Sequence, residues 1–322
     1  MGAWATIAGM VDGRRVLGIA MALVAGALLA VQARINGELG ERLGDGVAAA
    51  VISFASGLLI LLVTAALAPR MRAGIARLAA AVRERRLRWW QLVGGTVGAY
   101  LVACQGLTVG AIGVAIFTVA VVGGQSASGL LVDRLGIGPA GPQPITRARV
   151  LAAAGAVVAV VISVSDRFTA PAAVALAALP LVAGFALSWQ QAVNGRVGQA
   201  AGGPLTATLV NFAVGTVVLV VVAAVSTAVR GLPDAYPAQP WLYVGGTLGI
   251  PVVALGVLAV RWTGVLLLGM STVAGQILAA LLLDVVAPVA GRGPSVAAVV
   301  GCLLALGVVA AAGVAGGARM AG

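Results

Sequence analysis

The sequence predicts an all-α polytopic membrane protein whose ten transmembrane helices form two inverted five-helix repeats, 1–168 and 169–322. Three observations predict this class: the composition, ten long apolar runs, and a glycine and amide pattern that occurs twice. The chain is 61% hydrophobic and 9% charged, whereas a soluble domain is about 45–50% apolar and about 25% charged. Most of its surface is therefore expected to face lipid.

Ten apolar runs approach the length of about 20 residues that crosses roughly 30 Å of hydrocarbon. The expected spans are, in order, 16–33, 47–67, 90–109, 113–132, 150–164, 172–193, 205–229, 241–260, 264–287 and 296–315. The arginine pair before the first run resembles a secretory signal. We expect a retained helix instead, because the residues after this run are repeated after the sixth.

The repeat appears when the sequence is aligned with itself. An offset of 158 aligns 32–57 with 190–215 without a gap, and nine of these 26 positions are identical. An offset of 151 aligns later segments, including WWQLVGGTVG with the run from Trp241 and GGQSASGLLVD with AGQILAALLLD. The seven-residue difference places an insertion between the second and third spans. Matches of Gln, Asn, Asp, Trp and Phe are not expected by chance in this composition.

An odd number of spans per unit sends the second copy into the membrane from the opposite side, an arrangement common in secondary transporters. With a cytoplasmic N-terminus, fifteen of the twenty arginines face the cytoplasm, as the positive-inside rule requires. We therefore expect a multi-pass protein of the cytoplasmic membrane with both termini cytoplasmic. The seven arginines of 70–88 are expected on a short amphipathic surface helix, with no nucleic-acid partner.

The repeated pattern Q-x3-N-G-x2-G-x3-G, followed by F-x2-G and then by G-Q-x7-D, resembles the YdcZ-type inner-membrane exporter family. That family belongs to the drug/metabolite transporter superfamily, and the chain resembles its fused, two-copy form. The resemblance implies a ten-helix bundle with a central cavity between the halves and a role in export or exchange. It does not imply a substrate.

Two glutamines are the first candidates for substrate binding. Gln125 and Gln276 each lie twelve residues into a span, and the spans enter from opposite sides, so both are expected at mid-membrane. We expect them to face one shared cavity. A neutral amide donates and accepts hydrogen bonds, which suits an uncharged or zwitterionic ligand. The alternative is that both only join helices by hydrogen bonding.

The Gln–x3–Asn pairs are further cavity candidates. Gln32 and Asn36 share one helix face, as do Gln190 and Asn194, and the two faces are expected to line opposite mouths of the path. The alternative is a helix C-cap, because Asn-Gly tolerates a left-handed turn. Phe54 and Phe212 are interpreted as packing residues.

Few groups are available for other chemistry. Asp133 and Asp284 are expected near span ends, as helix-end residues or as sites of proton or cation coupling. The two cysteines lie in apolar runs and the chain has no histidine, which excludes the usual Cys/His metal sites. We therefore expect no metal, no cofactor and no enzymatic activity.

Together these features predict a secondary transporter that exports a small metabolite or drug across the cytoplasmic membrane by alternating access. Its expected partners are the small-molecule substrate and the lipid bilayer, and a homodimer is the candidate oligomer. Uniport, exchange and ion coupling all remain open. The alternative is a non-transporting membrane scaffold or assembly protein, which would not need two-sided symmetry.

Overall fold

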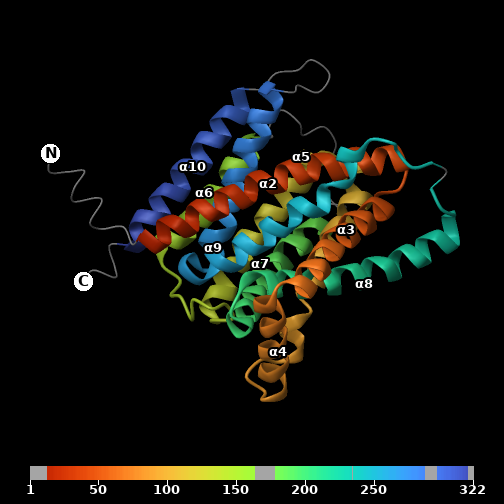
Figure 1. Cartoon of the computed structure of the whole chain (residues 1–322). Coiled ribbons are helices and arrows are strands. Elements are labelled where there is room, and N and C mark those ends of the chain that lie inside the picture. The colour runs from red at the N-terminus through yellow and green to blue at the C-terminus, as the bar shows by residue number, and fades with distance from the viewer. Residues whose placement is uncertain (1–12, 164–177, 234, 287–295, 318–322) are drawn as a thin grey trace.

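The structure, a computed structural model, describes residues 13–163, 178–233, 235–286 and 296–317 (Figure 1). Its elements are α2 (Gly13–Leu43), α3 (Gly46–Leu67), α4 (Pro69–Arg83), η1 (Trp89–Leu92), α5 (Gly95–Arg134), α6 (Arg147–Ser163), α7 (Ala178–Ala201), α8 (Pro204–Arg230), η4 (Pro240–Tyr243), α9 (Gly245–Val286) and α10 (Val296–Gly317). No strand occurs in these ranges, so the predicted all-α class is confirmed for them. The expected boundary between the halves, 168/169, and both expected cytoplasmic termini lie outside the described residues.

Several of these helices have the length and composition of membrane spans. Four described segments are long and apolar enough to cross a bilayer: Gly13–Leu43, Gly46–Leu67, Pro204–Val229 and Pro240–Leu283. Large apolar side chains are also exposed along the helices, as Leu59, Val217 and Leu303 illustrate. A soluble protein rarely exposes so many large apolar side chains. The fold is therefore that of an all-α membrane protein.

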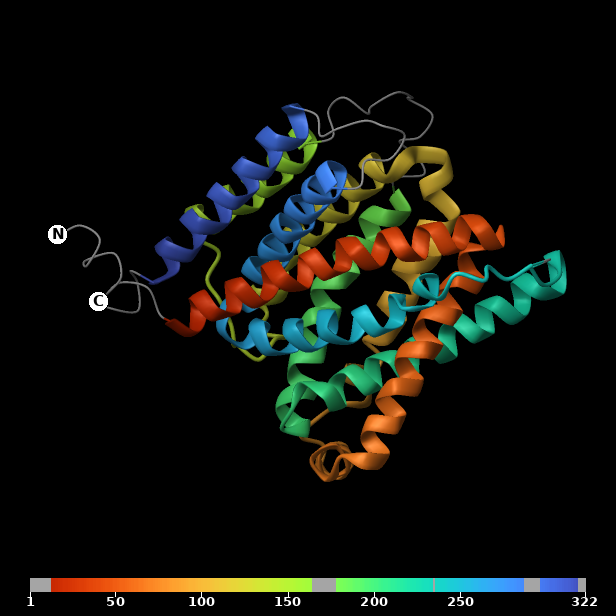
Figure 2. The same cartoon turned by 45° about the horizontal axis from the view of Figure 1, so that its top comes forward.

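Two of the helices cover more than one expected span. The residues of α9 form two helical segments that join at Gly264, where φ is 71°, so the break falls at the predicted start of the ninth span. In contrast, α5 is helical over all 40 residues, including residues 110–112, which separate the third and fourth expected spans. Figure 2 shows the ribbon of α5 changing direction within this length.

The two halves meet through helix pairs that contact at glycines. α2 lies along α9, and α7 lies along α5 (Figures 1 and 2). A Cβ at Gly26 would overlap the carbonyl oxygen of Thr272, and a Cβ at Gly184 would overlap that of Val121. Gly26 and Gly184 are related by the offset of 158, and their contacts by the offset of 151. Only glycine allows backbones this close.

The alternative interpretation of Asn36-Gly37 and Asn194-Gly195 as helix C-caps is wrong. α2 continues through the first pair to Leu43, and α7 continues through the second to Ala201. The left-handed residues are instead Gly44, with φ 62°, and Gly202, with φ 71°. Each is the last glycine of its repeated pattern, so the earlier Asn-Gly pairs present their side chains from a helix.

The insertion of the first half forms an amphipathic helix, as predicted, and its position at the membrane surface stays a prediction. α4 buries a stripe of Met71, Gly74, Leu78 and Ala81 and exposes its other face. Arg77 donates two hydrogen bonds, 3.0 and 2.8 Å long, to the last carbonyl of α7. Figure 2 shows α4 nearly end-on while α3 runs lengthwise, so α4 lies across the end of α3.

Candidate functional site

Two aromatic rings meet where α3 of the first half passes α8 of the second. The ring centroids of Phe54 and Phe212 are 5.2 Å apart with an interplanar angle of 34°. Each ring also covers a glycine of the opposite helix, because a Cβ at Gly57 would overlap Phe212 and a Cβ at Gly215 would overlap Phe54. The two phenylalanines therefore pack against each other, as interpreted from the sequence, and they join the halves at equivalent positions.

The repeated Gly-Gly-Thr motif brings helix backbones into contact beside these rings. A Cβ at Gly95 would overlap the carbonyl oxygen of Asn211 on α8, and a Cβ at Gly246 would overlap that of Ser53 on α3. These residues are again pairs related by the repeat. The motif thus seats the first turn of α5 on the second half and the first turn of α9 on the first half.

The Gln–x3–Asn pair of the second half lies on the glycines of the first half. Nε2 of Gln190 lies 3.4 Å, and Oδ1 of Asn194 2.7 Å, from the positions that a Cβ would occupy at Gly98 and Gly94. Both amide side chains are buried. They project from α7 toward the start of α5.

The equivalent pair of the first half lies on the glycines of the second half. Nε2 of Gln32 lies 2.8 Å from the Cβ position of Gly249, and Oδ1 of Asn36 would overlap a Cβ at Gly245. Every contact of one amide pair thus has a counterpart at the other. We call Gln32, Asn36 and Ser53 the first amide cluster, and Gln190, Asn194 and Asn211 the second.

These clusters hold polar atoms without partners among the described residues. Oδ1 of Asn36, Oγ of Ser53 and Nδ2 of Asn211 are buried and accept or donate no hydrogen bond there. Ser53 is 3% exposed and Asn211 is 2% exposed. An unpaired buried polar group costs about 1–3 kcal/mol. This cost points to a water or a ligand as their partner.

Ser53 and Asn211 were missed by the sequence analysis. They are equivalent through the offset of 158 and each precedes its phenylalanine, but they differ in residue type. A search for positions that are polar in both copies, rather than identical, would have found them.

Gln125 lies beside a small cavity at a different place. This cavity has a volume of about 10 Å³ and is lined by Val122, Gln125, Ser126, Ala156, Leu266, Gly269, Met270 and Val273. It has room for about one water molecule. Gln276 is not among the lining residues, although it lies on the same segment of α9. The shared cavity of the two glutamines stays a prediction.

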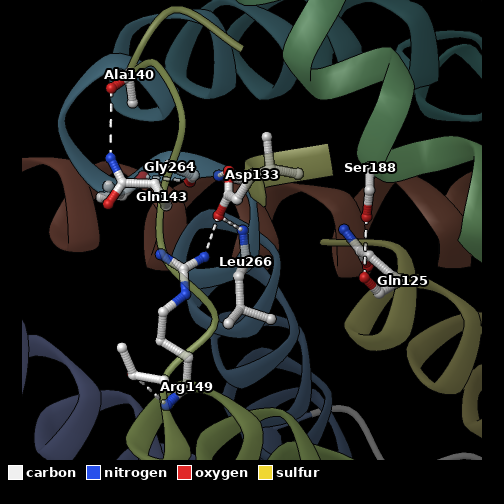
Figure 3. A network of polar contacts seen from close by, with 11 residues as sticks. Gln125, Asp133, Ala140, Gln143, Arg149, Ser188, Gly264 and Leu266 are labelled. Atoms are coloured by element: carbon white, nitrogen blue, oxygen red, sulfur yellow. Dashed lines mark hydrogen bonds and ion pairs between the residues drawn. The ribbon is translucent and has the colours of Figure 1, made fainter. Parts of the chain in front are cut away.

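The surroundings of Gln125 are seen in Figure 3. Oγ of Ser188 donates a 2.9 Å hydrogen bond to the backbone carbonyl of Gln125. Ser188 lies two residues before Gln190 on α7. The helix that carries Gln190 and Asn194 therefore also contacts the backbone of Gln125.

Asp133 caps a helical segment. Its carboxylate accepts hydrogen bonds from the backbone N–H groups of Val265 (2.8 Å) and Leu266 (3.1 Å), directly after the break at Gly264, and it pairs with Arg149 (Figure 3). An acidic group at a helix N-terminus satisfies free N–H groups and the helix dipole. The side chain of Asp284, the equivalent residue, lies outside the described part of the structure.

Among the described residues no group of three or more Cys, Asp or Glu side chains is placed to hold a metal ion. Cys104 and Cys302 are both buried and form no disulfide. The polar chemistry of the described interior is therefore carried mainly by amides and hydroxyls.

Two related sets of helices, joined through glycines and flanked by paired amides, define a membrane protein built from a duplicated helical unit. The family model described as "Putative inner membrane exporter, YdcZ" matches residues 17–162 and again residues 175–311. The chain belongs to this family, in its fused two-copy form, so the resemblance seen in the sequence is confirmed. Membership supports a membrane transport role of the exporter type.

A comparison of structures supports the fold. One protein of known crystal structure matches with a TM-score of 0.65 and 18% identity, over 93% of this chain and 96% of that chain. At this identity the likeness concerns the fold alone. No match was found among curated proteins.

Proposed function

We propose that this chain is a ten-span secondary transporter that exports a small uncharged or zwitterionic molecule by alternating access between two inverted halves. Its family of inner-membrane exporters supports the transport role. The break at Gly264 supports two spans within α9, and the 40-residue length of α5 exceeds what one span of about 20 residues needs.

One observation carries the proposal: each half places its amide cluster on the glycine motif of the other half. Gln32 and Asn36 lie on Gly249 and Gly245, and the second cluster repeats this arrangement on the first half. Because the two interfaces are built from equivalent contacts, the contacts that close one mouth have counterparts that close the other. One mouth can therefore open while the equivalent mouth closes. Inverted repeats produce alternating access by this exchange.

In this mechanism the phenylalanine pair forms the barrier between the two mouths. The rings close the space between the amide clusters, and the amides then bind substrate on whichever side is open. Because both clusters consist of amides and hydroxyls, they bind uncharged or zwitterionic groups without a charged partner.

Gln125 and Gln276 are proposed as a further part of the substrate path. They act with the clusters if the small cavity beside Gln125 widens in the open forms. Asp133 and Asp284 are proposed as helix-end residues, and coupling to a proton or cation is the alternative. The capping bonds of Asp133 support the helix-end role for that residue over coupling.

The test starts from a thermal-shift screen of the purified full chain against metabolite and drug panels. Stabilising compounds are then measured for transport in proteoliposomes. Gln190→Ala and Gln32→Ala should each weaken binding by a few-fold to about tenfold, which corresponds to one amide hydrogen bond of about 0.5–1.5 kcal/mol. Gln199→Ala is the matched control, because Gln199 is exposed on the same helix as Gln190.

Equal affinity in all three variants would refute the role of the amides. Stabilising compounds that are bound but never transported would favour the scaffold instead. A proposed homodimer is tested separately, by the mass of the detergent-solubilised protein.

A further inference from the structure

An apolar groove runs along α4, outside the site described above. It has a volume of about 430 Å³ and is lined by Ile75, Leu78, Ala79, Val82, Arg83 and Leu92. All but the last of these belong to α4, and Leu92 closes the groove from η1. Ile75 is 40% exposed, and the nearby Trp89 is 72% exposed. The groove is therefore an open, apolar trough.

The charge around the groove is strongly positive. Seven arginines occur between 70 and 88, against the single acidic residue Glu84. Arg77 is bound to the end of α7 and Arg72 to the carbonyl of Ala66. Arg83, in contrast, lies in the groove wall and forms no ion pair or side-chain hydrogen bond within the described ranges. Its guanidinium is available to an external anion.

The position of α4 suits the surface of a bilayer. It follows α3 after a single residue, Ala68, and it lies across the end of that helix (Figure 2). α3 is one of the segments that are long and apolar enough to span. A helix in this position lies at the level of lipid headgroups, with its apolar trough open to acyl chains.

We propose that the α4 groove binds one anionic phospholipid, with an acyl chain along Ile75, Ala79 and Val82 and the phosphate on Arg83. An arginine pairs with phosphate through two parallel N–H donors, and basic clusters beside a span attract anionic lipids. A second copy of this chain is a poor occupant, because docking through this face would bring two arginine clusters together.

The test uses the full chain in dodecyl maltoside and native mass spectrometry. Dioleoylphosphatidylglycerol and dioleoylphosphatidylcholine are titrated in parallel, so that only the headgroup differs. The native chain should bind the first lipid more tightly. Arg83→Gln should lower the affinity for phosphatidylglycerol by about fivefold, the effect of one basic side chain near a charged surface.

Three further variants separate charge from shape. Arg83→Lys should keep most of the binding. Arg134→Gln, an exposed arginine at the end of α5, should bind like the native chain. Ala79→Leu fills the groove from an exposed position and should weaken binding of phosphatidylglycerol although Arg83 is retained.

Equal binding of the two lipids by the native chain would overturn the proposal. It is also overturned if Arg83→Gln and Arg134→Gln bind phosphatidylglycerol equally, or if Ala79→Leu binds it as well as the native chain does. Thermal midpoints of the variants, measured without added lipid, verify that each is folded.

Discussion

Removal of the Asp133 carboxylate is expected to destabilise the junction between α5 and the second segment of α9. Asp133→Ala removes two hydrogen bonds to backbone N–H groups and leaves Arg149 without its ion-pair partner. Loss of a cap costs about 1 kcal/mol. Loss of one partner of a buried ion pair costs about 3–5 kcal/mol.

The expected cost lies near the lower end of that range. The side chain of Asp133 is 3% exposed but that of Arg149 is 22% exposed, so water screens the arginine that is left behind. We expect Asp133→Ala to cost about 3 kcal/mol in the free energy of unfolding. Asp133→Asn keeps one accepting oxygen and should cost less.

Asp45 provides a matched control in the same chain. It caps α3 with hydrogen bonds of 2.8 and 3.1 Å to the backbone N–H groups of Val47 and Ala48, and it has no ion pair within the described residues. Asp45→Ala should therefore cost only the cap, about 1 kcal/mol. The difference between the two alanine variants measures the ion pair and its burial.

The assay is urea unfolding of the purified protein in dodecyl maltoside, followed by tryptophan fluorescence. The double variant Asp133→Ala, Arg149→Ala should be more stable than the sum of the single losses predicts, by about 1–3 kcal/mol of coupling between contacting residues. An Asp133→Ala variant no less stable than Asp45→Ala would refute this reasoning.

Further predictions concern packing, backbone strain and topology. Gly246→Ala places a Cβ against a backbone carbonyl and should cost about 1–3 kcal/mol, whereas Gly256→Ala, on the same helix with open space around it, should cost nothing in urea unfolding. Phe212→Ala should cost about 3–5 kcal/mol in the same assay, and a smaller loss would contradict the central position of the ring pair. Arg85→Gly should raise the unfolding midpoint by relieving a left-handed residue with φ 58°, worth about 1–2 kcal/mol; an unchanged midpoint would argue against strain there. Ala76→Cys, exposed on α4, should react with an impermeant maleimide only from the cytoplasmic face, and labelling from outside would reverse the proposed orientation.

The apolar runs and the repeat predicted much of the fold. The break of α9 at Gly264 could be predicted because it falls at a glycine between two expected spans. The helix of the insertion, α4, could be predicted because its segment is amphipathic and rich in arginine. The continuous helix over 95–134 could not be predicted from the apolar runs. Backbone hydrogen bonds can continue through the short segment that separates two such runs. The position of the left-handed glycine was also not predictable, because each repeated pattern contains several glycines that could end the helix. Tertiary packing determines that the helix ends at Gly44 and not at Gly37.

The candidate site was predicted less completely. Identity between the repeats identified Gln32 and Asn36 and the equivalent residues of the second half. It did not show that each amide pair contacts the glycines of the other half. That contact depends on how the halves dock. The ion pair of Asp133 with Arg149 was also invisible, because a loop of irregular structure decides where the arginine lies.

The central claim is tested most directly by reciprocal accessibility of the two amide clusters. Asn36→Cys and Asn194→Cys are combined on a background with Cys104 and Cys302 replaced by alanine. The first cysteine is alkylated from outside with a bulky impermeant maleimide, which holds that mouth open. Alternating access predicts that labelling of the second cysteine from inside then slows markedly relative to the unmodified protein. An unchanged rate at residue 194 would contradict alternating access between the two clusters.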